Sequence, residues 1–319
     1  MLREAIRGMK QISIFLLVSI MLLQAPLAVA NDSASTMPTI HRMPAYLLEI
    51  PEAVKSILIA ETETATMHRF ASDDGGVLEV DQRYMSIGLN GPGKEKAWDK
   101  RTPLGIYFIT ESLDTSKLHA KYGAAAFPLD YPNAWDRFNQ RTGYGIWLHG
   151  VDPDNPNRPA RDTDGCLALP NEEIVKLAVE LKPLLTPVIV AREIDWVAPS
   201  NIKELRQEFR GMLDMWRESM ERGDIAKYLS LYSADSHHFG MGREEWLSST
   251  RESFDNKRFE SIKLEDVMLV AHPEEPDLYL SRFTQVLASV EGLRKITTKR
   301  LYWHRSNAKQ WKILIEDAG

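Results

Sequence analysis

The chain contains a single cysteine, Cys166, among its 319 residues. No intramolecular disulfide can form, so the fold depends on hydrophobic cores alone. The length suits two domains of ordinary size, and each of them must bury a core of its own.

Residues 1–30 have the pattern of a secretory signal peptide. Basic residues come first, an apolar run over 12–23 is too short to span a bilayer comfortably, and Ala-Val-Ala at 28–30 is a typical cleavage site. We therefore expect an exported protein, periplasmic in a host with two membranes, in which residues 31–45 form a linker. An uncleaved membrane anchor is the alternative. An unpaired cysteine in such an oxidising compartment is either a liability or a reactive group.

The charge balance excludes two classes of partner. The formal net charge is −6 at pH 7, and removal of residues 1–30, which carry a net charge of +2, would leave −8. An acidic protein has no general electrostatic attraction to nucleic acid or to anionic lipid. We therefore expect neither nucleic-acid binding nor stable membrane insertion of the mature chain.

The pattern of apolar residues changes near residues 195–200, where we place a domain boundary. Over 46–195, short apolar segments alternate with Gly- and Pro-rich loops, which is typical of strands. The strand candidates are 56–60, 66–70, 78–89, 105–110, 145–148 and 187–191, with a hairpin turn at 73–76. We predict a mainly-β domain that contains one helix, with Asn171 as its N-cap.

The second predicted domain, over 200–319, is α+β. Its first apolar residues recur at spacings of three and four, namely Ile202, Leu205, Phe209, Met212, Trp216 and Met220. This spacing predicts an amphipathic helix that Ser200 or Asn201 caps and that Gly223 ends. A short helix over 224–232 follows. Alternating segments over 259–269, 278–287, 293–304 and 309–316 then predict a curved antiparallel sheet.

An aromatic, irregular segment lies over residues 112–141. It contains Tyr122, Phe127, Tyr131, Trp135 and Phe138. Long loops beside a site often form lids or substrate walls. The alternative is that these rings simply pack the loop against the core.

Cys166 has the neighbours that a thiol nucleophile needs. A free thiol is mostly protonated at neutral pH, so a base must take its proton before it attacks. His149 is the best candidate, because it lies on a short strand that leads into the loop carrying the cysteine. Gly165 allows a tight turn beside the sulfur, and we expect N–H groups there to hold the oxyanion of a tetrahedral intermediate. The implied reaction is acyl transfer through a thioester; a buried structural thiol is the alternative.

These residues resemble the catalytic motif of the L,D-transpeptidase (YkuD-type) family. After His149-Gly150 and a spacer comes Thr163-Asp164-Gly165-Cys166-Leu167-Ala168-Leu169, where the family has Ser/Thr-His-Gly-Cys-hydrophobic-Arg-Leu. Two further elements fit the family pattern, Thr102-Pro103-Leu104-Gly105-Ile106-Tyr107 and Gly88-Leu89-Asn90-Gly91. The resemblance covers about residues 46–192 and implies a YkuD-like β-sandwich that acts on peptidoglycan stem peptides. Cys166 would attack the L,D bond before the terminal D-alanine, and His149 would protonate the leaving amine.

Two departures from the family motif bear on the activity. Asp164 replaces the second His, and Ala168 replaces an Arg that is expected to support the loop or the substrate's carboxylate. Asp164 would either orient His149 and raise its basicity, or only form a local turn. Arg158 or Arg161 would either supply the missing positive charge or lie solvated in the loop. The residues that we expect to contact substrate are Gly150, Asp164, Arg158 and Arg161.

The sequence after Cys166 resembles a divergent branch of the family. That branch includes enzymes that trim tetrapeptide stems or detach proteins from peptidoglycan, as well as cross-linkers. The acyl acceptor stays open between an amine and water, so an L,D-carboxypeptidase is one alternative. A non-catalytic peptidoglycan-binding protein is the other. No metal or organic cofactor is implied.

Residues 201–317 resemble the SnoaL/NTF2-like fold. The matching features include Trp216-Arg217, the segment 223–229 and Trp311-Lys312-Ile313. Such cone-like domains bind small ligands or partners, or form dimers, so a cell-wall protein partner and a homodimer both stay open. We expect a non-catalytic role in holding peptidoglycan or a partner near the cysteine. His237 and His238 are adjacent and should point apart, which favours ordinary loop histidines over metal ligands.

Overall fold

The computed structural model describes residues 42–73, 76–238, 240–255, 259–289 and 294–319. The predicted signal peptide and most of the predicted linker lie outside these residues, as do positions 74–75 of the predicted hairpin turn. Within the described part of the chain, no helix is long and apolar enough to cross a membrane.

A five-stranded sheet lies at the centre of the first domain. Its strand order is β5 (Gly76–Tyr84), β4 (Thr66–Asp73), β3 (Ile57–Glu61), β12 (Pro187–Ala191) and β7 (Gly105–Phe108). The two central strands β3 and β12 are almost entirely apolar and buried, as expected where both faces of a sheet are covered. Val188 and Val190 of β12 belong to a core inside the first domain, whereas Ile189 belongs to a second core that continues into the C-terminal domain.

Two smaller sheets carry the residues around the cysteine. One has the order β11 (Leu167–Ala168), β9 (Trp147–His149) and β8 (Ala126–Pro128), and the other pairs β10 (Arg161–Thr163) with β6 (Ile87–Gly88). Helix α2 (Asn171–Ala178) follows the cysteine segment, and α1 (Ala134–Phe138) lies within the aromatic segment. Leu148, Leu167 and Leu169 are fully buried on either side of the nucleophile and fix the position of its loop.

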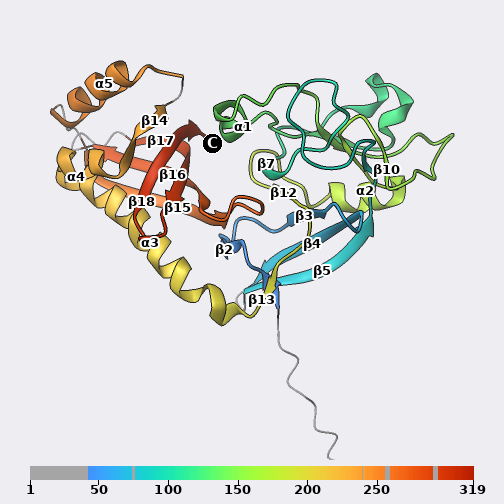
Figure 1. Ribbon diagram of the computed structural model, residues 1–319, viewed down its shortest axis with the longest axis horizontal. Coiled ribbons are helices and arrows are strands. Elements are labelled where there is room, and N and C mark those ends of the chain that lie inside the picture. The colour runs from blue at the N-terminus through green and yellow to red at the C-terminus, as the bar shows by residue number, and fades with distance from the viewer. Residues whose placement is uncertain (1–41, 74–75, 239, 256–258, 290–293) are drawn as a thin grey trace, which may run out of the picture. The chain divides into compact units, whose positions relative to one another are not determined.

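The C-terminal domain is a six-stranded sheet with helices. Its order is β14 (Tyr232–His238), β18 (Trp311–Ala318), β17 (Arg294–Arg305), β16 (Leu278–Ser289), β15 (Phe259–Ala271) and β2 (Leu47–Glu49). The long helix α3 (Pro199–Arg222) runs along this sheet (Figure 1) and contacts β15. Phe209, Leu213 and Trp216 are fully buried on its apolar side. The edge strand β2 comes from the N-terminal side of the first domain.

The structure confirms the predicted fold class and corrects several details. Helix α3 has Ala198 as its N-cap, with Pro at the first helical turn, so the prediction of Ser200 or Asn201 is wrong; Gly223 ends the helix in the left-handed conformation as predicted. The short helix α4 (Ile225–Ser230) is followed at once by β14, and α5 (Arg243–Asp255) was not predicted. The strands β1 (Met43–Pro44) and β13 (Trp196–Val197) pair beside the predicted domain boundary.

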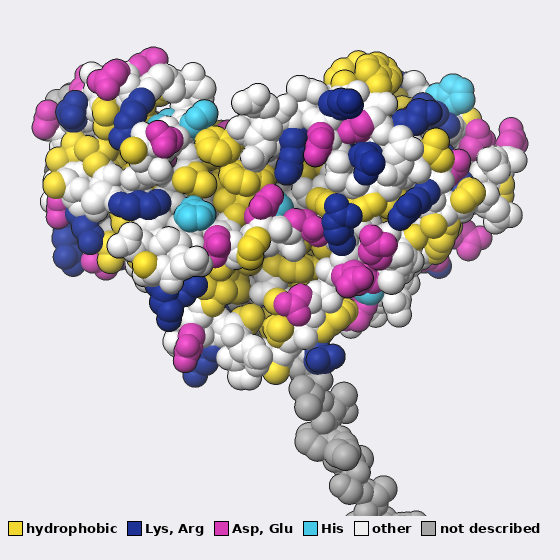
Figure 2. Space-filling model, viewed as in Figure 1, with side chains coloured by type: hydrophobic (Ala, Val, Ile, Leu, Met, Phe, Trp, Pro, Cys, Tyr) yellow, Lys and Arg dark blue, Asp and Glu magenta, His cyan; other side chains and the backbone are white. Residues whose placement is uncertain are grey.

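On the face shown in Figure 2, basic and acidic side chains are interspersed over both domains.

Candidate active site

Cys166 and His149 line one pocket, a cavity of about 590 Å³ in the first domain. The remaining walls come from four segments, with the lining residues Lys94, Ala97, Trp98, Lys100, Lys121, Tyr122, Gly143, Tyr144, Gly145, Trp147, Arg158, Asp162, Thr163 and Asp164. The structure therefore brings the predicted nucleophile and the predicted base to a common site.

Strand pairing places the nucleophile beside β9. Leu167 lies opposite Leu148 in the parallel pair of β11 and β9, so Cys166 comes next to Trp147. The Trp147 N–H donates to Sγ at 3.4 Å, and the thiol donates to the Gly145 carbonyl at 3.4 Å. Burial raises the pKa of the Cys166 thiol to about 11. The thiol is therefore protonated at neutral pH.

His149 is held as a neutral base. Its Nδ1–H donates to the Gly150 carbonyl at 2.5 Å, which leaves the lone pair on Nε2 to accept a proton. Burial, together with the positive charges of Arg158 and Lys121, lowers the pKa of His149 to about 4. None of the hydrogen bonds of the described residues joins Cys166 to His149. Both groups are therefore neutral at pH 7.

Gly165 is required by the backbone of the nucleophile loop. Its φ is +128°, and a Cβ there would lie 2.6 Å from the Arg101 carbonyl oxygen. Its N–H donates to the Thr163 hydroxyl at 3.0 Å, so among the N–H groups expected there to hold an oxyanion this one is already used. The Cys166 N–H is not used by any hydrogen bond of the described residues. That N–H is the better candidate oxyanion donor.

Thr102 connects the nucleophile loop to a preceding strand. Its hydroxyl donates to the Gly165 carbonyl at 3.0 Å and accepts from the Gly88 N–H at 2.9 Å. The side chain is fully buried. Gly88 itself leaves no room for a side chain, because a Cβ would lie 2.5 Å from the Lys100 carbonyl oxygen. Three elements that carry the family resemblance thus meet around the cysteine.

Two of the four predicted substrate-binding residues line the pocket. Arg158 Nε lies 2.7 Å from the carboxylate of Asp162. Asp164 is 77% exposed, and its carboxylate lies 3.7 Å from Lys100 Nζ. It makes no hydrogen bond or ion pair with His149 among the described residues, so the structure gives no support to the alternative in which Asp164 orients the histidine.

Gly150 and Arg161 are not among the residues that line the pocket. The Gly150 N–H donates to the Tyr122 carbonyl at 3.1 Å, and a Cβ at Gly150 would lie 2.2 Å from Asn171 Oδ1. Gly150 therefore supports the histidine strand. The Arg161 guanidinium packs beside Gly91, 3.4 Å from where a Cβ would stand.

Asn171 links two loops instead of capping α2. Its Oδ1 accepts from the N–H groups of Ala124 at 2.9 Å and Val151 at 3.1 Å, and its Nδ2 donates to the Val151 carbonyl at 2.8 Å. The N-cap is Pro170, which makes no side-chain capping bond. The predicted cap is therefore wrong because the amide side chain serves the loops on either side of His149.

In the aromatic segment over 112–141, one ring forms a wall of the pocket and the other four pack into the cores. Tyr122 lines the pocket, with its ring centroid 4.4 Å from that of Trp147 and 5.2 Å from that of His149. The other four rings pack into the cores, Phe127 and Tyr131 into one and Trp135 and Phe138 against the other.

The two adjacent histidines lie on β14 instead of in a loop. His238 is buried and stacks on Trp246 with centroids 3.6 Å apart, whereas His237 packs edge-on to Phe138 at 4.8 Å. Their rings thus have different neighbours, as adjacent strand residues should. Within the described residues, no group of three His, Cys, Asp or Glu side chains is arranged to hold a metal ion.

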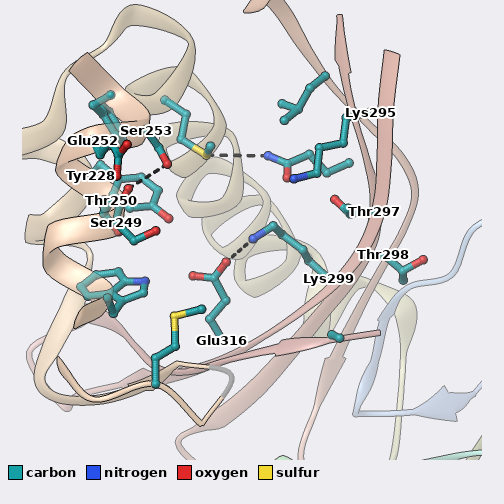
Figure 3. A pocket seen from close by; sticks show the side chains of 17 residues that line it. Tyr228, Ser249, Thr250, Glu252, Ser253, Lys295, Thr297, Thr298, Lys299 and Glu316 are labelled. Carbon is teal, nitrogen blue, oxygen red and sulfur yellow. Dashed lines mark hydrogen bonds and ion pairs between the residues drawn. The ribbon is translucent and has the colours of Figure 1, made fainter. Parts of the chain in front are cut away.

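The C-terminal domain has a pocket of its own, about 840 Å³ in volume. In Figure 3 hydroxyl side chains of α5 lie on one side of it and Lys295, Thr297 and Thr298 of β17 on the other. Glu316 forms an ion pair with Lys299 at its base. Burial would raise the pKa of Glu316, but the charge of Lys299 and hydrogen bonds lower it to about 2. The pocket therefore offers a fixed pair of opposite charges.

Comparison with known families decides what the two domains are. Residues 56–190 match the L,D-transpeptidase catalytic domain (YkuD), and residues 208–317 match the Cds6 C-terminal NTF2-like domain. This chain is an L,D-transpeptidase catalytic domain followed by an NTF2-like domain. The catalytic domain supports an L,D-transpeptidase-family enzyme, and that family acts on peptidoglycan peptides. A search of curated proteins found no match.

Two solved structures resemble this chain over both domains. Bd1075 from Bdellovibrio bacteriovorus has a TM-score of 0.72 and 26% identity, covering 87% of this chain and 99% of that one. The helical cell shape determining protein Pgp2 from Campylobacter jejuni has a TM-score of 0.66 and 23% identity, covering 85% of this chain and 96% of that one. The same two-domain fold therefore occurs in both.

Proposed function

We propose that this protein is a periplasmic enzyme that cleaves peptidoglycan stem peptides through a thioester on Cys166, in cell-wall remodelling. One observation carries the proposal: the only thiol of the chain lies in a pocket that His149 also lines, with an N–H of the nucleophile itself available for an oxyanion. The likeness to a cell shape determining protein supports a role at the cell wall.

The proposed reaction begins from neutral groups. His149 Nε2 takes the thiol proton while sulfur bonds to the carbonyl carbon of the third stem residue, and the Cys166 N–H stabilises the oxyanion. Collapse breaks the C–N bond, and the imidazolium gives its proton to the departing D-alanine amine. The thioester then passes to water or to an amine, with His149 again acting as the base. Water as the acceptor gives an L,D-carboxypeptidase, and an amine gives a transpeptidase.

We assign recognition of the terminal D-alanine carboxylate to the cations of the pocket. Arg158 and Lys121 both line it, and both act electrostatically on the thiol and on His149. They supply the positive charge that the family's arginine would carry at the position of Ala168, which is buried here. Asp164, held near Lys100, limits how much positive charge the rim presents.

The raised thiol pKa favours one rival, a protein that binds peptidoglycan without cleaving it. We propose that the C-terminal domain contributes binding in either case, with its Lys299–Glu316 pair facing a polar ligand of the cell wall or of a partner.

Acylation by a carbapenem, followed by intact-mass spectrometry, separates the enzyme from its rival. We expect one adduct per chain on the mature protein, none on Cys166→Ala and a much slower reaction of His149→Gln. The variant Val179→Ala, which changes an exposed side chain outside the lining of the pocket, should react as the wild type does. Absence of an adduct on the folded wild-type protein would favour the binding protein.

A further inference from the structure

Two exposed aromatic residues stand at the pocket that holds Cys166. Trp98 is 86% exposed and Tyr144 is 79% exposed, which places them among the three most exposed large apolar side chains of the described residues. Both line the pocket. Single exposed apolar residues are ordinary, but a pair of rings at one catalytic pocket indicates a binding surface.

The loop that carries Trp98 is built to hold this ring outward. Trp98 has a φ of +64°, a conformation that is strained for a bulky residue and persists only where neighbours fix it. The Asp99 carboxylate fixes it, because it accepts from Lys94 Nζ at 2.7 Å and from the N–H groups of Glu95 and Lys96 at 2.9 and 3.0 Å. Burial would raise the pKa of Asp99, but these bonds lower it to about 2.

The segment of Tyr144 is bonded to the same loop. The Thr142 N–H donates to the Glu95 carbonyl at 2.9 Å, and the Ala97 N–H donates to the Thr142 hydroxyl at 3.2 Å. A Cβ at Gly143 would lie 3.3 Å from the Ala97 backbone, so the two segments are in contact. The two rings therefore belong to one structural unit.

We propose that Trp98 and Tyr144 form a stacking platform for a pyranose ring of the glycan strand to which the stem peptide is attached. This rests on the proposed function. The face of an aromatic ring is negative, and the C–H groups on the apolar face of a sugar are polarised positive. An ammonium group would be repelled by Lys96 and Lys100, which lie within two residues of Trp98. Three extended residues span roughly 10 Å. The sugar therefore lies about that far from the scissile bond, and Trp98 and Tyr144 line the same pocket as Cys166.

The test compares a disaccharide-linked tetrapeptide with the same tetrapeptide lacking sugar, measuring KM and kcat for D-alanine release. The variant Trp98→Asn suits the positive φ and so avoids strain, and Trp98→Phe keeps a ring. Loss of one stacking contact should raise KM for the sugar-linked substrate about three- to tenfold and leave the free peptide unchanged. Tyr144→Ala should act in the same direction, Trp98→Phe should restore most of the preference, and Val179→Ala should change neither substrate.

A binding measurement keeps the platform and the proposed function separable. Calorimetric titration of Cys166→Ala with the two ligands should show tighter binding of the sugar-linked one, and Trp98→Asn in that background should remove the difference. If the wild type releases no D-alanine but this preference is present, the proposed function fails and the platform stands. If Trp98→Asn leaves the preference intact, or weakens both ligands equally, the sugar platform is refuted.

Discussion

The reactivity of Cys166 should follow from its burial. With a pKa of about 11 instead of the usual 9.0, the thiolate fraction at pH 7 is about 100-fold lower than for an ordinary thiol. A more basic thiolate is the better nucleophile. With a Brønsted coefficient of about 0.4–0.5, the rate constant of the thiolate itself rises roughly tenfold over two pKa units. We therefore expect exchange with 4,4′-dithiodipyridine at pH 7 to be about tenfold slower than for an ordinary exposed thiol.

The pH dependence of this exchange is the decisive readout, because it does not depend on steric access. The rate should rise about tenfold per pH unit from pH 6 to pH 10 without a plateau. The same chain unfolded in urea supplies a matched control, since it contains no other thiol, and it should level off near pH 9. A plateau in the exchange rate of the folded protein below pH 8 would show a thiolate–imidazolium pair, and would contradict a neutral thiol beside a neutral imidazole.

Three further predictions concern the residues around the thiol. Thr102→Val leaves the Gly88 N–H and the Gly165 carbonyl without their partner. We expect the free energy of unfolding in urea to fall by about 1–3 kcal/mol and kcat to fall as well; an unchanged unfolding midpoint would contradict a stabilising role of these two hydrogen bonds. Gly165→Ala should abolish carbapenem acylation, whereas Gly211→Ala, where a Cβ meets nothing within 4 Å, should not. Burial lowers the pKa of His149 from 6.5 to about 4 on folding. The neutral histidine therefore contributes fully to stability above pH 6.5, and this contribution is lost as the pH falls towards 4, at up to about 1.4 kcal/mol per pH unit. The free energy of unfolding in urea should therefore fall less between pH 7 and pH 5 for His149→Gln than for the wild type.

The sequence predicts those parts of the site that are local in the chain. Cys166 and Gly165 are neighbours, and His149 begins the stretch that returns to them, so the strands β9 and β11 pair and bring the three together. The apolar spacing of α3 likewise predicts its buried face. Such features need no knowledge of which distant segments meet.

Residues that act through tertiary contacts were not predictable in this way. Asn171 has the appearance of a helix cap, but its amide serves loops that lie 20 and 47 residues earlier in the chain. The exposure of Trp98 could not be predicted from the sequence, because it depends on the hydrogen bonds of Asp99 and not on a periodic pattern of apolar residues. Asp164 could have oriented the histidine only if its side chain turned inward, and the structure pairs it with Lys100 at the surface. Helix α5 was missed because its amphipathic pattern is weak, with Trp246 as its one buried residue.

Catalysis by Cys166 is tested by mass spectrometry of purified disaccharide tetrapeptides incubated with the mature protein, with the Cys166→Ala variant in parallel. We expect the wild type, and not the variant, to remove D-alanine from the tetrapeptide. The product is a tripeptide if water is the acceptor and a new cross-link if an amine is. Unchanged tetrapeptides, or equal conversion by Cys166→Ala, would contradict catalysis by this thiol.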